Sequence, residues 1–229
     1  MPGLIGTYDK SGRLVMLPRG VYGPQEDTLL LRDALERETI GTGTTVLDVG
    51  TGSGFLALAA ARRGARVTAV DRTRRSVLAT RLNAALAGLR VEAVRGDLLA
   101  PAAGRRFDLI LSNPPYVPAP DAALPARGPA RAWDAGHDGR LVLDRLCDGA
   151  AGLLRPGGAL LLVHSALCGV PATLERLERA GLPAEVTDRR RVPFGPVLAS
   201  RRQWLLDRGL ITPGDDKEEL VIIRAERAE

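Results

Sequence analysis

The stretch VLDVGTGSG, residues 46–54, decides the fold class of this chain. Its first residues are mostly apolar and β-prone, as in a buried parallel strand. Glycines then occupy positions 50, 52 and 54, and the helix-forming run FLALAAA follows at residues 55–61. A strand, a glycine turn and a helix in this order bring the backbone close to a ligand at the helix N-terminus. The pattern therefore predicts an α/β fold with a ligand cradle.

The glycine spacing and the preceding acid narrow the type of ligand. The dinucleotide pattern G-x-G-x-x-G would place its third glycine at position 55, where this chain has Phe55. The carboxylate just before the turn would repel a pyrophosphate, but it suits a ligand with an ammonium or sulfonium charge. We therefore expect a cationic cofactor. The residues expected to bind it here are Asp48, Gly50, Gly52 and Gly54.

Two further acids each follow a short β-prone run. The run ARVTAV at residues 65–70 leads into Asp71, and VEAVRG at residues 91–96 leads into Asp97. An acid about 20 residues beyond a glycine turn can accept hydrogen bonds from both ribose hydroxyls of an adenosine ligand. Asp71 is therefore expected at the ribose. Either acid could instead be the N-cap of an exposed helix, because aspartate is favoured there.

The run NPPY, residues 113–116, predicts a site for a planar amino group. An amide or aromatic amine nitrogen is a poor nucleophile because its lone pair is delocalised. The Asn113 side-chain oxygen and the Pro114 carbonyl can hold such an NH2 group as acceptors. Pro115 forces Pro114 away from the α region, and Tyr116 could lie against the flat face of the acceptor. The alternative is a proline-rich strand exit with a surface tyrosine.

These motifs together resemble the HemK/PrmC family of protein-glutamine N-methyltransferases, which are class I S-adenosylmethionine-dependent enzymes. Two other segments resemble the short branch of that family, found in eukaryotes and archaea, which acts on class I release factors. The segments are VYGPQEDTLLL at residues 21–31 and AWDAGHDGR within residues 132–140. The resemblance covers roughly residues 21–159.

The resemblance implies S-adenosylmethionine as cofactor, S-adenosylhomocysteine as product and a protein glutamine as methyl acceptor. It also implies a protein substrate of the translation-factor type in the cytoplasm, and a small zinc-binding activator to which nothing in the sequence itself points. In the family, the acid matching Asp97 faces the adenine amino group, and the backbone of the next residue meets the ring. Cofactor contacts are implied for Tyr22, Thr28, Asp48, Gly50, Gly52, Gly54, Asp71, Asp97, Leu98 and Asn113. Acceptor contacts are implied for Asn113, Pro114, Pro115 and Tyr116.

The chain departs from the family pattern in three places. Enzymes of the PrmC type carry a helical domain before the glycine turn, whereas 45 residues precede Val46 here. The short branch typically has glutamate where this chain has Asp48. Residues 192–216 form an added segment before an expected last strand at residues 220–223.

Length and composition favour one methyltransferase domain over residues 1–229, with residues 1–43 as an extension that completes the cofactor pocket. Aromatic residues make up 3%, so the core must be aliphatic. No apolar stretch approaches the roughly 18 residues of a membrane span, and the start lacks a signal peptide pattern. Cys147 and Cys168 are too few for a disulfide scaffold or a metal site, and we expect both to be buried hydrophobic residues in a reducing compartment.

The net charge of +5 would favour an anionic partner, but only two of the 32 basic residues are lysines, which indicates a compositional bias. The arginines at 189–191 and 201–202 could form a basic patch for RNA. No aromatic residues interleave with them, so we favour a solvated face.

Alternating strands and helices predict a right-handed, doubly wound, mostly parallel seven-stranded sheet of Rossmann-like type. We expect a hairpin of residues 14–17 with 21–22, and helices at 25–38, 141–154 and 173–180. The helix at 141–154 should stop at RPGG, residues 155–158, before a strand at 159–163. The long loop at residues 118–140 is a candidate lid, in which Trp133 packs the loop or contacts substrate.

Other functions fit parts of this sequence. An exocyclic base amine of RNA or DNA presents the same planar NH2, although base-flipping enzymes usually have an added recognition surface. A small-molecule or peptide methyltransferase could use residues 192–216 to shape a different site. A silent scaffold would retain the fold alone, which intact Asp48, Asp71 and Asn113 argue against. Methyl transfer to an amide needs little acid–base catalysis, so we expect His164 to be packed and leave His137 open.

Overall fold

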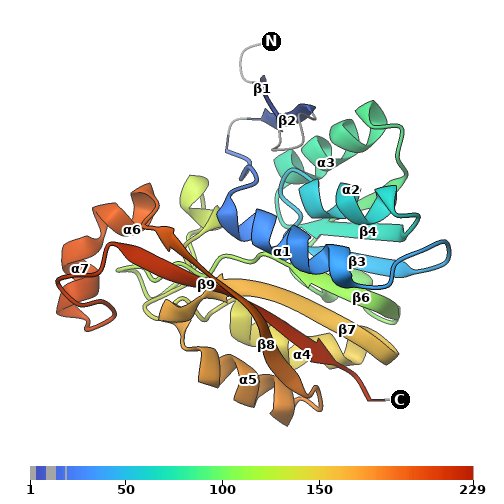
Figure 1. Cartoon of the computed structure of the whole chain (residues 1–229). Helices are drawn as coiled ribbons and strands as arrows, with labels where there is room; N and C mark the ends of the chain where they lie inside the picture. The colour runs from blue at the N-terminus through green and yellow to red at the C-terminus, as the bar shows by residue number, and fades with distance from the viewer. Residues whose placement is uncertain (1–3, 9–13, 19, 229) are drawn as a thin grey trace.

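The computed structural model describes residues 4–8, 14–18 and 20–228, and a seven-stranded sheet forms its centre (Figure 1). The strands of this sheet are β3 (Thr45–Val49), β4 (Arg66–Asp71), β5 (Val91–Arg95), β6 (Phe107–Ser112), β7 (Leu154–Ser165), β8 (Ala184–Pro193) and β9 (Lys217–Glu226). They lie in the order β5-β4-β3-β6-β7-β9-β8. The first five pair in parallel, whereas β9 is antiparallel to both of its neighbours. The expected doubly wound, mostly parallel seven-stranded sheet is confirmed.

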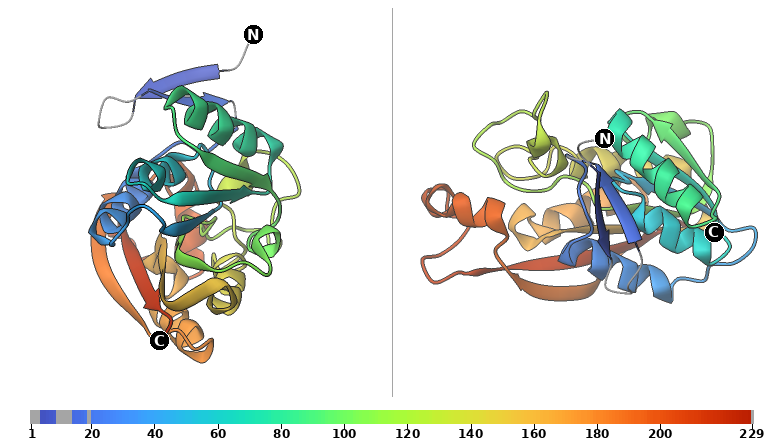
Figure 2. Two further views of the ribbon diagram at one scale, coloured as in Figure 1. Left: turned by 90° about the vertical axis from the view of Figure 1, so that its right-hand side faces the viewer. Right: turned by 90° about the horizontal axis from the view of Figure 1, so that it is seen from above.

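Helices cover both faces of the sheet. They are α1 (Glu26–Arg37), α2 (Phe55–Arg62), α3 (Arg74–Leu86), α4 (Leu143–Ala150), α5 (Val170–Arg179), α6 (Pro196–Ser200) and α7 (Arg202–Asp207). Helices α1, α2 and α3 lie on one face, and α4 and α5 lie on the other (Figures 1 and 2). The short 3-10 helices are η1 (Ala100–Ala102), η2 (Pro129–Ala132), η3 (Ala151–Leu153) and η4 (Ala166–Cys168).

The core is aliphatic, as the composition predicted. The central strands β3 and β6 bury nearly every side chain, and Leu47, Ile110 and Leu111 have no exposed surface. Strands covered on both faces read as continuous apolar runs, which is why these two were recognisable in the sequence. Because their ends are held this rigidly, the residues that follow them have fixed positions.

The expected N-terminal hairpin pairs differently from the prediction. Strand β1 (Leu4–Tyr8) pairs antiparallel with β2 (Leu14–Pro18), and residues 21–22 belong to no strand. The hairpin packs on α3 through Asn83, whose side-chain amide accepts from the Met16 N–H at 2.8 Å and donates to the Met16 carbonyl at 3.1 Å. The predicted pairing was wrong because this side-chain amide, and not a third strand, holds the backbone of β2.

The sequence RPGG at residues 155–158 does not end a helix. Helix α4 and η3 occupy part of the predicted helix, and β7 already begins at Leu154. Gly157 and Gly158 exchange backbone hydrogen bonds with Arg227 just beyond β9. A Cβ at Gly158 would lie 2.9 Å from the Arg155 carbonyl and 3.0 Å from that of Phe107. The glycine therefore marks an irregularity in the ladder, which is its usual meaning inside a strand.

Strand β8 was not predicted, and it explains the arginine run. Arg189 pairs with Glu219, and Arg190 pairs with Asp33 at 3.0 Å. Arg201 pairs with Asp134 at 2.7 Å, and the Arg202 side chain donates to the carbonyls of residues 213 and 215. These four arginines therefore bind acidic side chains or backbone carbonyls of other segments of the chain.

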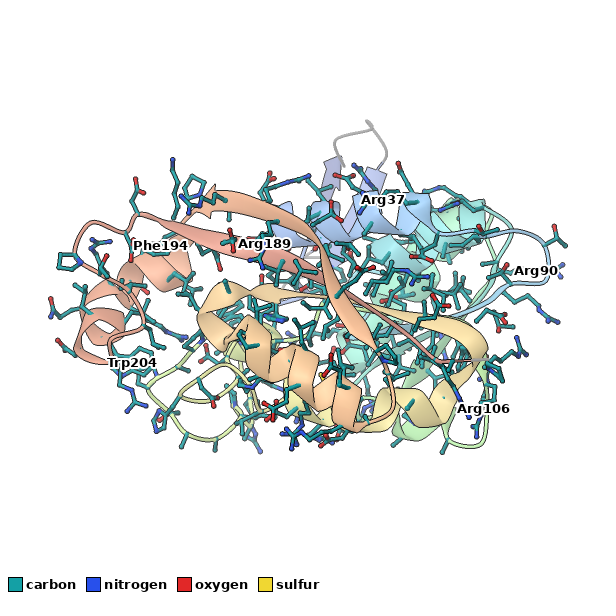
Figure 3. The ribbon with its side chains drawn as sticks, turned by 60° about the horizontal axis from the view of Figure 1, so that its bottom comes forward. Arg37, Arg90, Arg106, Arg189, Phe194 and Trp204 are labelled. Carbon is teal, nitrogen blue, oxygen red and sulfur yellow. The ribbon has the colours of Figure 1, made fainter. Side chains whose placement is uncertain are left out.

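The added segment at residues 192–216 contains the end of β8, the helices α6 and α7, and the connection to β9. Leu198, Leu205 and Ile211 form a small buried cluster of their own, against which Phe194 and Trp204 pack. Figure 3 shows these two aromatic residues at one end of the molecule. The predicted last strand, residues 220–223, is the centre of the longer β9.

Candidate active site

A cavity of about 800 Å³ lies where β3, β4, β5 and β6 end. The strand order reverses between β3 and β6, and ligands of open α/β sheets bind outside the carboxyl ends of the strands at such a point. The predicted residues that line this first cavity are Tyr22, Thr28, Gly50, Gly52, Asp71, Asp97, Leu98, Asn113 and Pro115. The predicted residues that do not line it are Asp48, Gly54, Pro114 and Tyr116.

The glycine turn joins β3 to α2 in the left-handed conformation that side chains rarely adopt. The φ angles of Gly52 and Gly54 are +55° and +85°. A Cβ at Gly52 would stand 3.4 Å from the Tyr22 carbonyl, and a Cβ at Gly54 would stand 2.9 Å from the Thr80 side chain. Gly52 therefore leaves room beside the cavity, whereas Gly54 allows α2 to begin tightly against α3.

Asp48 lies behind the glycine turn and is 1% exposed. Its Oδ2 accepts from the Thr51 hydroxyl at 2.6 Å and from the Ala57 N–H at 3.1 Å, while Oδ1 has no partner among the described residues. Burial raises the pKa of Asp48 to about 6, against the lowering effect of these hydrogen bonds. The structure thus differs from the expected direct contact: Asp48 anchors the turn to α2 and places negative charge behind the cavity wall.

Asp71 ends β4 and borders the cavity. Its Oδ2 accepts from the Gly52 N–H at 3.1 Å, and its Oδ1 accepts from the Thr73 N–H at 2.8 Å. Burial raises the pKa of this carboxyl. Thr73, not Asp71, is the N-cap of α3, and its hydroxyl accepts from the Ser76 N–H. Asp71 therefore holds the glycine turn against the end of β4 and is not a helix cap.

Asp97 and Leu98 follow β5 at the same edge of the cavity. Asp97 is paired with Arg145 of α4, and the N-cap of the following η1 is Leu99. Within the described part of the chain, Leu98 is the one non-glycine residue with a positive φ, +47°. Such a backbone costs about 1–2 kcal/mol and is typical of functional sites.

The NPPY run begins where β6 ends. The Ser112 hydroxyl donates to the Val49 carbonyl at 2.9 Å, which joins the ends of β6 and β3. A Cβ at Gly50 would lie 3.7 Å from the Asn113 carbonyl oxygen, so the glycine turn and the run pack backbone to backbone. Pro114 is buried, while Asn113 and Pro115 line the first cavity.

Asp27, which the sequence patterns did not single out, connects the residues around this run. It is buried in the first turn of α1. Its Oδ1 accepts from the N–H and the hydroxyl of Thr28, at 2.6 and 3.1 Å. Its Oδ2 accepts from the phenols of Tyr22 and Tyr116, at 3.1 and 3.0 Å. Burial and the Asp27 charge raise the pKa of both phenols, so both remain donors.

A directed chain of hydrogen bonds leads from Asp27 to Asn113. Because the Thr28 hydroxyl donates to Asp27, its oxygen can only accept from a further partner. Nδ2 of Asn113 donates to that oxygen at 3.1 Å. The Asn113 Oδ1 is then left as a hydrogen-bond acceptor. The carboxylate of Asp27 thereby determines which end of the Asn113 amide is available to an incoming amino group.

A second cavity, of about 600 Å³, shares five wall residues with the first. Tyr116 and Trp133 line it, and Tyr116 is 7% exposed, so this tyrosine is a wall of the second cavity and a partner of Asp27. Glu218 also lines it, with no described partner for its Oε2, and burial raises its pKa to about 7. Residues 192–198 of the added segment form much of the remaining wall.

The histidines and cysteines lie apart from the first cavity. His164 is buried in β7, its Nδ1 lies 2.8 Å from the Ser165 carbonyl, and burial lowers its pKa to about 4. His137 contacts the Ala119 carbonyl in the loop. Cys147 and Cys168 are buried free thiols, as expected. In the part of the chain that the structure describes, no side-chain group is arranged for a metal ion, and no helix is long and apolar enough to cross a membrane.

Comparison with known proteins agrees with this geometry. The model of the family described as the methyltransferase small domain matches residues 19–124. A protein of Methanocaldococcus jannaschii, provisionally named a protein N5-glutamine methyltransferase, is 33% identical over 179 residues, which cover 78% of this chain and 89% of the relative. The release factor glutamine methyltransferase of Deinococcus radiodurans is 43% identical over 190 residues, which cover 80% of this chain and 68% of the relative.

A solved structure of the same kind is the Mtq2–Trm112 complex of E. cuniculi, described as responsible for methylation of the translation termination factor eRF1. Its matching chain has a TM-score of 0.64 and 28% identity, over 91% of this chain and 99% of that one. The chain described here therefore belongs to the family of release factor and protein N5-glutamine methyltransferases, and it is a methyltransferase enzyme.

Proposed function

We propose that this enzyme transfers a methyl group from S-adenosylmethionine to the side-chain amide nitrogen of a glutamine in a translation release factor. The observation that carries the proposal is the oriented Asn113 amide, which lines the first cavity while Tyr116 of the same run lines the second. A translation factor as substrate would place the reaction in the cytoplasm. We also propose that residues 1–229 form one methyltransferase domain.

The residues of the first cavity fit S-adenosylmethionine. Glycines with positive φ leave its wall free of side chains at the turn, and Asp71 borders it. Behind the turn lies Oδ1 of Asp48, which has no hydrogen-bond partner among the described residues. Asp71 would hold the ribose hydroxyls, and Asp97 with the Leu98 backbone would hold the adenine. When bound, this cofactor supplies an electrophilic methyl group on a positively charged sulfur. The negative charge of Asp48 favours a cationic ligand there.

The acceptor nitrogen has to be held with its lone pair facing the methyl carbon. Asn113 Oδ1 would accept one amide hydrogen of the glutamine, and the Pro114 carbonyl would accept the other. Both acceptors are fixed before the substrate arrives. Asn113 is held by Thr28, and Pro114 is buried next to Pro115, just beyond the end of β6. Such positioning supplies effective molarities of about 10⁵–10⁸ M, so the residues need no acid–base step at the nitrogen.

We infer that the second cavity admits the acceptor segment of the substrate. It adjoins the NPPY run, and its wall combines Trp133, residues of the 192–198 segment and three carboxylates, Glu26, Asp27 and Glu218. These carboxylates would repel the phosphates that flank a target base, which favours a protein acceptor over RNA or DNA. The Mtq2–Trm112 relative also suggests that a small activator subunit binds this enzyme.

Methylation of purified candidate acceptors tests the proposal directly. The protein, with and without a small activator of the Trm112 type, is incubated with labelled cofactor and a release factor of the same organism. Mass spectrometry should locate one added methyl group on a glutamine side chain, and a Gln→Ala release factor should remain unlabelled. Label that enters RNA and resists protease would contradict the proposed acceptor.

The Asp27–Thr28–Asn113 chain predicts opposite outcomes for two similar substitutions. Thr28→Val removes the hydroxyl but keeps the shape, so Asn113 loses its orientation and kcat should fall roughly tenfold, the scale of one lost polar contact. Thr28→Ser keeps the hydroxyl and should retain most of kcat. Calorimetry with S-adenosylhomocysteine measures cofactor-site integrity separately. Equal kcat values for the two variants would show that the hydroxyl does not orient Asn113.

Asp48→Asn should weaken S-adenosylmethionine binding about tenfold at pH 7.5, because a negative charge near a cationic ligand is lost. The effect on the free protein has the opposite sign. The raised pKa of Asp48 means that its contribution to stability is present below about pH 4 and is lost as the pH rises through about 6. The variant should therefore gain stability relative to wild type between these pH values, as thermal melts would show. If the stabilities of the variant and of wild type change with pH in parallel, the pH dependence belongs to a group other than Asp48.

A further inference from the structure

The rim of the first cavity carries more positive charge than its proposed cofactor requires. Of the described residues, seven arginines and two aspartates line it, although the net charge of the whole chain is +5. S-adenosylmethionine carries a sulfonium and an ammonium against one carboxylate, so it offers these arginines little negative charge to pair with. The ligand that the arrangement favours is an anion.

Four of these arginines surround a side cavity of about 420 Å³. Arg72 directly follows β4, Arg95 ends β5, Arg131 belongs to η2 and Arg145 lies on α4. The one acid in the described lining is Asp97, and it is paired with Arg145. Among the residues that the structure describes, no carboxylate forms an ion pair with the other three arginines. Three guanidinium groups from three segments therefore share a cavity, and none of them has an ion-pair partner among the described residues.

Arg131 is the least satisfied member of this group. Its Nε is buried and has no hydrogen-bond partner among the described residues. Burial lowers the pKa of its guanidinium, and the charges of Arg72 and Arg95 lower it further, while the charge of Asp71 acts in the opposite direction. The Arg95 Nε donates to the Arg72 carbonyl at 3.3 Å, so these two residues are neighbours. A buried donor without an acceptor costs about 1–3 kcal/mol, which a bound anion would remove.

We propose that Arg72, Arg95 and Arg131 form a binding site for a phosphate group. Planar guanidinium groups match the oxygen geometry of phosphate and donate to two of its oxygens at once. The cavity suits a single phosphate with its waters, and its described lining contains no aromatic residue on which a nucleic-acid base could stack. Free phosphate and the phosphate of a small nucleotide share this chemistry.

Bound phosphate would also hold the 118–140 loop against the sheet. Arg131 comes from that loop, whereas Arg72 directly follows β4 and Arg95 ends the adjacent strand β5. The right-hand view in Figure 2 shows the yellow-green loop standing out from the body of the molecule. Leu124 of the loop lines both cavities. Phosphate and S-adenosylhomocysteine should therefore strengthen each other's binding. This coupling rests on the proposed cofactor site, whereas phosphate binding alone does not.

Calorimetric titration with inorganic phosphate, at an ionic strength held constant with chloride, tests the site. Wild-type protein should bind phosphate, and R131Q and R95Q should each weaken the affinity about tenfold or more. R90Q is the matched control, because Arg90 precedes β5 and lies roughly 17 Å along the strand from Arg95. Figure 3 shows Arg90 at the end of the molecule opposite to Trp204. No phosphate binding by wild type, or equal losses in R90Q and R131Q, would overturn the proposal.

Titrations with adenosine and its monophosphates distinguish the two sources of phosphate. If a monophosphate binds more tightly than adenosine, and R131Q abolishes this difference, the ligand is a nucleotide. If only the binding of inorganic phosphate depends on Arg131, the ligand is the free ion. In saturating phosphate, wild type should bind S-adenosylhomocysteine about fivefold more tightly, and R131Q should show no change. If phosphate binds without this change, the coupling is wrong and the site stands. Far tighter binding of a short RNA through Arg131 would contradict the small-ligand assignment.

Discussion

Replacement of Asn113 by alanine should lower kcat about 10²–10³-fold, the scale for loss of one placed polar group that acts on the reacting atoms. Its Oδ1 is the acceptor that the Asp27–Thr28 chain leaves available, so the truncated side chain can no longer hold an amide hydrogen of the substrate. The affinity for S-adenosylhomocysteine should change little, because the glycine turn and Asp71 are untouched. Single-turnover kinetics and calorimetry measure the two quantities separately.

Tyr116→Phe serves as the comparison for this variant. It removes one donor to Asp27 and keeps the ring, while the bond from Thr28 to Asn113 remains. We expect a loss of kcat of about tenfold or less, the scale of one hydrogen bond to a charged group. An Asn113→Ala protein that turns over nearly as fast as wild type would refute the assignment of the acceptor. Equal losses in both variants would assign the effect to packing of the run.

Local patterns were enough to predict the cofactor half of the fold. A buried strand, a glycine turn and a following acid are each encoded within a few residues, and parallel strands place such residues at one edge. That is why Gly52, Asp71, Leu98 and Asn113 come together on one cavity as predicted. The same reasoning predicted that Asp48 would line this cavity, which it does not. Sequence shows that an acid ends the strand, but not whether its side chain turns toward the ligand or toward α2.

Asp27 was missed because its role depends on contacts across the chain. In the sequence it is an ordinary acid in the first turn of a helix, where acids are favoured for electrostatic reasons. Its bond to Tyr116 spans 89 residues, and it gains meaning only when α1 packs beside the NPPY run. A signal existed in VYGPQEDT, where an acid and a threonine are adjacent, but the direction of the hydrogen bonds needs coordinates.

The C-terminal third was harder to predict because its strands lie where the sheet becomes antiparallel. Strand β8 has one face exposed, and its three consecutive arginines resemble a charged surface segment in the sequence and do not indicate a strand. The glycines at the start of β7 are typical of a turn in the sequence, but in the structure they lie where the pairing of the strands is irregular. Glu218 likewise reads as one of several acids before the last strand, yet it lines the second cavity. Burial, which sequence does not give, separates it from its neighbours.

Gly139→Ala should destabilise the protein by about 2–4 kcal/mol, which corresponds to a fall in Tm of roughly 5–15 °C for a chain of this size. Gly139 has a φ of +73°, and a Cβ there would stand 2.1 Å from the Tyr116 carbonyl oxygen and 2.9 Å from the Cys168 sulfur. The same carbonyl accepts from the Cys168 thiol at 3.0 Å, so it cannot easily move. The loop and the NPPY run are therefore packed together at this glycine.

Gly104→Ala separates the cost of the backbone conformation from the cost of the clash. Gly104 has a φ of +78°, but nothing lies within 4 Å of a Cβ placed there. Its substitution should cost about 1 kcal/mol and leave kcat unchanged. Gly139→Ala should lower kcat as well, since displacement of Tyr116 disturbs its bond to Asp27 and hence the orientation of Asn113. Thermal melts measure stability, and turnover is measured below the melting range. Equal Tm and equal kcat for the two variants would mean that the loop does not position the acceptor site.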